Sequence, residues 1–96
     1  MNTTIKVEGF EQILGQQVRF SSSETSFDAT VHQVDRLTRH PDAPRQPFSV
    51  IFLVTQTNPY EQQTFTLQHP LAGEIPIFLV PVGPADDGMR YEAVFN

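Results

Sequence analysis

The sequence predicts an all-β protein, a small antiparallel barrel or sandwich of about six strands with one short N-terminal helix. Apolar residues alternate with polar ones in several short segments, as is typical of half-buried strands. Eight prolines and five glycines separate these segments. Because only one segment has helical periodicity, no helices are available to connect parallel strands. With 96 residues, the chain is expected to form a single domain spanning residues 1–96.

The one segment with helical periodicity is Glu8–Leu14. Its residues Phe10, Ile13 and Leu14 have the spacing of one helix face, and Gly15 is suited to end the helix. A helix of two turns is too short to be stable alone. We therefore expect it to close one end of the strand structure.

Two strands are expected after the helix. Val18 and Phe20 define the first, and Phe27–Val31 begins the second. Val34 breaks the alternation of the second strand. The sequence therefore predicts either that Val34 faces outward or that a β-bulge lies near His32–Gln33.

The middle of the chain contains a proline-rich loop and two further strands. Residues 40–47, HPDAPRQP, cannot pair regularly because proline lacks a backbone N–H. Phe48–Val54 is apolar on both faces, which favours a central strand with cover on each side. Phe65 and Leu67 mark a strand with one apolar face.

The C-terminal third is expected to be a β-hairpin. Its strands are Ile75–Val82 and Met89–Phe95, and they are joined by the glycine-bounded turn Gly83–Gly88. The first of these strands is apolar on both faces, yet it contains Pro76 and Pro81. Prolines inside a strand belong at an edge or at a bulge.

The phenylalanines follow this pattern. One phenylalanine, Phe10, is expected on the helix, and another, Phe78, on the second face of the proline-containing strand. The others are expected on core faces, and they are Phe20, Phe27, Phe48, Phe52, Phe65 and Phe95.

Composition excludes several function classes. The chain has no cysteine, which excludes disulfides, cysteine-ligated zinc and a cysteine nucleophile. The formal net charge of −5 disfavours nucleic acid and anionic membrane surfaces as partners. The N-terminus lacks the apolar region of a signal peptide, so we expect a cytoplasmic protein by default. The alternative is a protein that forms part of an exported or phage-like particle.

No catalytic or metal-binding constellation is apparent in the sequence. His32 and Asp35 would project from opposite faces of a regular strand, and His40 and His69 each precede a proline. The serines lack the G-x-S-x-G context of a nucleophile. The sequence therefore predicts a non-enzymatic protein without cofactor, metal or catalytic residues, although His32, Asp35 or His69 could still converge with another ionisable group.

The strands with two apolar faces predict an interaction surface, because a small monomer has difficulty covering both faces. We expect a protein partner or a homo-oligomer, docking through outward residues of these strands. The alternative is that the helix and the N-terminal arm around Ile5 and Val7 cover the second face. Since the outward face cannot be assigned from sequence, both Leu79 and Val80 are candidates for variants. The predicted interface residues are Phe78, Val80, Val82, Val94, Ile51 and Leu53.

A second function hypothesis is a barrel that binds a carbohydrate or lipid. Its site would lie at a mouth between the loops Pro41–Pro47 and Asn58–Gln63. The candidate contacts are Arg36, Arg39, Arg45 and Tyr60.

The C-terminal run IPIFLVPVGPADDGMRYEAVFN, with FEQILGQQVRF and QTFTLQHPLAG, resembles a family of small uncharacterised bacterial proteins, a domain of unknown function. The resemblance covers most of the chain and implies no catalytic or binding residue. It implies an association with phage-tail-collar-like proteins. An accessory or structural role in a tail-like or fibre-like assembly would follow from that association.

Overall fold

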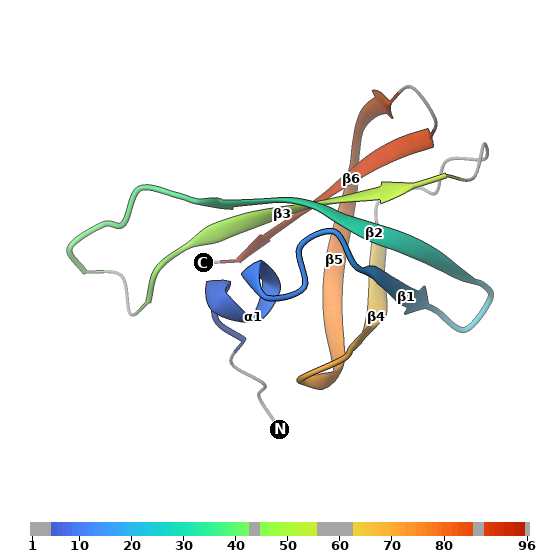
Figure 1. Ribbon diagram of the computed structural model, residues 1–96, viewed down its shortest axis with the longest axis horizontal. Helices are drawn as coiled ribbons and strands as arrows, with labels where there is room; N and C mark the ends of the chain where they lie inside the picture. The colour runs from blue at the N-terminus through green and yellow to red at the C-terminus, as the bar shows by residue number, and fades with distance from the viewer. Residues whose placement is uncertain (1–4, 43–44, 56–62, 86–87, 96) are drawn as a thin grey trace.

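The computed structural model describes residues 5–42, 45–55, 63–85 and 88–95. These residues form one helix and six strands, and the strands close into an antiparallel barrel with the order β1-β2-β3-β6-β5-β4 (Figure 1). The predicted fold class is confirmed, as a barrel. The elements are α1 (Val7–Glu11), β1 (Gln17–Ser21), β2 (Ser26–Arg36), β3 (Phe48–Val54), β4 (Gln63–His69), β5 (Gly73–Ala85) and β6 (Gly88–Phe95).

Aromatic side chains fill the barrel interior. Phe20 meets the Phe52 ring edge-on at a centroid distance of 4.9 Å, and Phe27 meets Phe65 in the same way at 5.0 Å. Such edge-to-face pairs stabilise a core beyond the area they bury. The expected core positions are confirmed for all the phenylalanines assigned to the interior, with Phe95 only partly buried.

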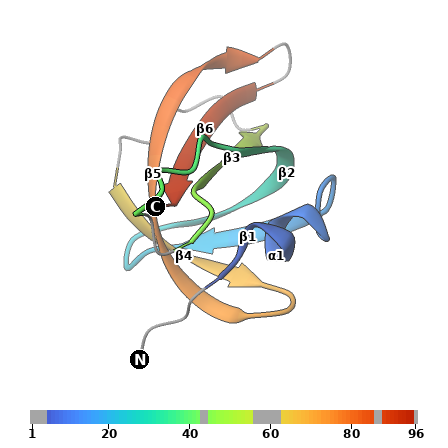
Figure 2. The same ribbon diagram turned by 90° about the vertical axis from the view of Figure 1, so that its left-hand side faces the viewer.

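Helix α1 closes one end of the barrel, as expected. Phe10 is fully buried there, and its ring lies 5.2 Å from that of His69 and 5.3 Å from that of Phe95. Figure 2 looks onto this end and shows α1 at one side of the ring of strands. The described part of the chain contains no helix that is long and apolar enough to cross a membrane.

The helix is shorter than the sequence indicates. It ends at Glu11, and the next residues form turns that lead to Gly15, which has a φ of 87°. The backbone N–H of Gly15 donates to the carbonyl of Val31, so the chain leaves the helix to meet β2. The expectation that Leu14 packs on the apolar helix face is wrong, because this turn leaves its side chain 53% exposed.

The predicted bulge in β2 is confirmed. The pairing of β2 with β3 shifts register between Val31 and Gln33, which returns Val34 to the inner face, where it is half-buried. Residues 37–42, which follow β2, extend away from the barrel as an arm (Figure 1).

Strand β5 explains how prolines occupy a strand in the middle of the barrel order. Its first half, Gly73–Leu79, pairs with β4, and its second half, Val80–Ala85, pairs with β6. Among the described residues, each half of β5 therefore pairs with a neighbouring strand on one side only. Pro76 lies in the first half, whose other edge makes no strand pairing, so a residue without a backbone N–H is tolerated there. Pro81 lies at a bulge, where the register shifts before Gly83. The prediction that these prolines lie at an edge or at a bulge is thus confirmed at Pro76 and Pro81. The strand β5 as a whole is not an edge strand, because β4 and β6 pair with it on opposite sides.

Candidate functional site

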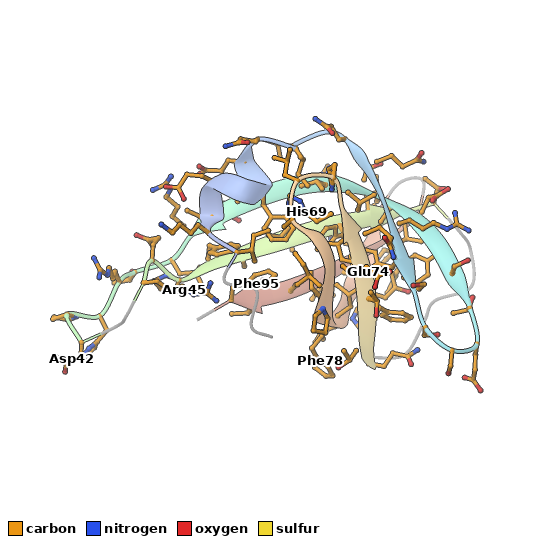
Figure 3. The ribbon with its side chains drawn as sticks, turned by 90° about the horizontal axis from the view of Figure 1, so that it is seen from below. Asp42, Arg45, His69, Glu74, Phe78 and Phe95 are labelled. Atoms are coloured by element: carbon orange, nitrogen blue, oxygen red, sulfur yellow. The ribbon has the colours of Figure 1, made fainter. Side chains whose placement is uncertain are left out.

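Three adjacent strands carry apolar side chains on the outside of the barrel. Val94 of β6 is 53% exposed, and Phe78 and Val82 of β5 are 52% and 44% exposed. Figure 3 shows Phe78 at the lower margin, pointing away from the barrel. We call the outward surface of these strands the β3-β6-β5 face, and its residues are Ile51, Leu53, Arg90, Glu92, Val94, Phe78, Val80 and Val82.

Strand register places these side chains in rows across the face. Ile51 of β3 pairs with Glu92 of β6, which pairs in turn with Val80 of β5. In the next row, Leu53 pairs with Arg90. Neighbouring positions in a row lie about 5 Å apart, so the side chains form one continuous surface.

The structure brings all six residues predicted as an interface onto this face. It also assigns the direction of the hairpin residues, because Leu79 is fully buried inside the barrel whereas Val80 lies outside and is half-buried. The alternative cover is wrong, since Ile5 and Val7 are buried in the core with α1 and leave Phe78 exposed. An apolar outer face is therefore a property of the described barrel.

Sequence reasoning missed the charged residues of the face. Glu92 and Arg90 are separated by one residue on β6 and lie between the apolar side chains of β3 and β5. No ion pair joins either to another described residue, and one Arg90 nitrogen donates to the carbonyl of Pro84 at 3.3 Å. The alternation of Met89–Phe95 is enough to place Arg90 and Glu92 on the same face of the strand. Only the strand register shows that apolar residues of β3 and β5 lie on either side of them.

Two arginines of the ligand hypothesis have structural partners. Arg36 holds Glu11 of α1 through Nε and one terminal nitrogen at 3.1 and 2.9 Å, with Glu8 at 3.8 Å. Arg45 donates to the carbonyl of Ile5 at 2.6 Å. Two of the four proposed contacts thus fix the N-terminal segment to the barrel.

The Arg36 contact changes the ionisation of its partner. Its hydrogen bonds, helped by its positive charge, lower the pKa of the Glu11 carboxyl. Glu11 raises the pKa of Arg36 in return. Of the remaining candidates, Arg39 lies on the exposed arm and Tyr60 lies outside the described residues.

His69 is buried and supports the fold. Its Nδ1 accepts backbone N–H donors from Leu71 and Ala72 at 3.0 and 3.2 Å. Nε2 lies 2.9 Å from the carbonyl of Gly9, so this nitrogen carries the proton and donates it. The ring therefore connects the β4–β5 turn with α1 and has no nitrogen left for a ligand.

The other ionisable candidates do not converge. His32 and Asp35 are both exposed on β2, and the Asp35 carboxylate accepts a hydrogen bond from the Gln33 amide at 2.5 Å. Within residues 5–42, 45–55, 63–85 and 88–95, no group of three or more His, Asp or Glu side chains could hold a metal ion. The serine run forms the β1–β2 turn, in which Ser22 Oγ accepts the backbone N–H of Thr25.

Comparison with known proteins adds one match. A family model described as "Domain of unknown function (DUF6916)" matches residues 5–95. No curated protein and no solved structure matches the chain. The matched region contains the whole described barrel, including the β3-β6-β5 face.

Proposed function

Because the chain belongs to the DUF6916 family, a domain of unknown function, we propose its role from the barrel itself: a non-enzymatic structural domain that binds another protein through the β3-β6-β5 face. The observation that carries the proposal is the set of outward apolar side chains on three adjacent strands, of which Phe78, Val82 and Val94 are about half exposed. We extend it to an accessory subunit of a tail-like or fibre-like assembly, the setting that the sequence resemblance implies.

The energetics of the face support docking. Fully burying a large apolar side chain stabilises a protein by about 1.5–3 kcal/mol, so covering the exposed half of Phe78 is worth about 1 kcal/mol. Val82 and Val94 contribute in the same way, because about half of each is exposed. Exposed apolar side chains gathered on one face are typical of protein contact sites.

Site-specific photocrosslinking in the cells that naturally make the protein tests this function. Phe78 or Val94 is replaced by benzoylphenylalanine, which bonds to a neighbouring chain when irradiated. The control position is Leu71, an equally apolar residue in the β4–β5 turn that is 64% exposed.

We expect discrete protein adducts from positions 78 and 94 and none from position 71. Adducts of any identity support docking through the face, because the reagent reports only what covers it. The same adducts from all three positions, or none from the face, would contradict the proposal.

A further inference from the structure

The β3-β6-β5 face is complementary to itself. The row of Phe52, Tyr91 and Pro81 runs across the three strands with its side chains toward the interior. Outward side chains lie in the rows on either side. One row holds Ile51, Glu92 and Val80, and the other holds Leu53, Arg90 and the β5 bulge with Val82.

A second copy can be placed on the face by a two-fold axis that runs along the Tyr91 row. The Leu53–Arg90 row of one copy would then lie over the Ile51–Glu92 row of the other copy, and the reverse. It would set Glu92 of each copy against Arg90 of the other. On β3 it would set Ile51 against Leu53, and on β5 it would set Val80 against the bulge at Val82. Within these two rows, each apolar position thus meets an apolar position, and each charge meets its opposite.

From this register, and resting on the proposed function, we infer that the protein bound at the face is a second copy of this chain in an antiparallel two-fold dimer. An isologous interface requires one patch to carry both members of each contact, and the two rows meet that requirement. The other in-plane axis, parallel to the strands, would set Glu92 against Glu92 and Arg90 against Arg90. The charges therefore select one arrangement.

The edge of the contact next to β2 agrees with this arrangement. On the β2 side, Thr30 pairs with Leu53 and Gln33 pairs with Ile51, so the apolar rows end in polar residues. A polar rim of this kind is usual in protein interfaces. Because three strands give a small contact, we expect a dimer that dissociates on dilution.

Charge reversal on the purified protein tests the inference by sedimentation equilibrium over a concentration series. The variants are Arg90→Glu and Glu92→Arg, each alone and then mixed in equal amounts. The matched control pair is Arg19→Glu and Glu74→Arg, which make the same changes of net charge elsewhere on the protein. Arg19 is exposed and forms an ion pair with Asp28, and Glu74 is exposed and accepts a hydrogen bond from Gln68.

The wild type is expected to pass reversibly from the 10.9 kDa monomer to twice that mass. Each reversal alone should weaken self-association roughly tenfold or more, because like charges then face each other. In the mixture, the Arg90→Glu chain presents two glutamates to the two arginines of the Glu92→Arg chain. Opposite charges then meet in both contacts, so the heterodimer should form with an affinity near that of the wild type. The control variants should dimerise as the wild type does, alone and mixed.

Two results would overturn the inference. A wild type that stays monomeric at millimolar concentration excludes a second copy as the occupant. A dimer unaffected by either reversal, or one not restored by mixing, excludes the two-fold arrangement. In both cases photocrosslinks from positions 78 and 94 to a different protein would leave the proposed docking function intact, whereas their absence would remove that function separately.

Discussion

Replacing Phe10 with alanine tests whether the N-terminal helix is an integral part of the core. The ring is fully buried at the end of the barrel and lies within about 6 Å of four other rings, those of Phe48, Phe52, His69 and Phe95. Truncation removes the whole ring and leaves a cavity, since the surrounding strands are held in register by their neighbours.

The expected loss is about 3–5 kcal/mol in the free energy of unfolding, the range for removing a buried phenylalanine. For a domain of this size, each kilocalorie lowers the midpoint of thermal unfolding by about 4–8 °C. Leu14→Ala is the matched control, because Leu14 follows the same helix but is 53% exposed, and its loss should stay below about 1 kcal/mol.

Urea unfolding followed by circular dichroism measures both variants. Phe10→Leu is included because it keeps most of the apolar volume and should fold even if the alanine variant does not. If Phe10→Ala and Leu14→Ala destabilised the protein equally, or if Phe10→Leu matched the wild type, the helix would not be packed as the structure indicates.

Three other predictions concern contacts that fix the barrel. Gly88→Ala should destabilise the protein by about 2 kcal/mol or more in urea unfolding, because the added Cβ would collide with the backbone carbonyl of Val54; a neutral effect would contradict that close approach. His69→Leu should cost about 2–4 kcal/mol, since it removes the acceptor of two backbone N–H groups and the donor to α1, and a cost under about 0.5 kcal/mol would argue against these bonds. The Glu11 carboxyl should titrate below the ordinary glutamate range by NMR and return to it in Arg36→Gln. Because the folded-state pKa is lowered, this contact stabilises the protein above the unfolded pKa and is lost as the pH falls through the folded one, so an unshifted titration in the wild type would refute it.

Local patterns predicted the parts of the fold that depend on neighbouring residues. The break in alternation at Val34 indicated a bulge, and the structure has one between Val31 and Gln33. Prolines in the C-terminal hairpin indicated positions with an unpaired edge or a bulge, and Pro76 and Pro81 occupy such positions. Phase and proline placement are local properties, so a single sequence carries them.

Long-range pairing lies beyond such patterns. The division of β5 between β4 and β6 depends on a register between strands far apart in sequence. Arg36 and Glu11 are 25 residues apart, so no spacing rule could show that this arginine holds α1 instead of a ligand. The end of α1 was misplaced for a related reason, because the backbone contact of Gly15 with Val31 redirects the chain before Leu14 can continue the helix.

The same distinction applies to the candidate surface. Composition and alternation identified six apolar residues that one barrel cannot readily bury, and all six lie on its outside. Their arrangement around Glu92 and Arg90 follows only from the pairing of three strands. Identification of the residues thus came from sequence, whereas the geometry on which the proposed dimer rests came from the fold.

The most direct measurement of the central claim is a structure of the protein in the assembly isolated from its own cells. We predict that another chain covers the β3-β6-β5 face there, so that Phe78 and Val94 lose the exposure of about half of their surface that they have in the isolated barrel. A native assembly in which this face points into solvent, with contacts made elsewhere on the barrel, would contradict the account.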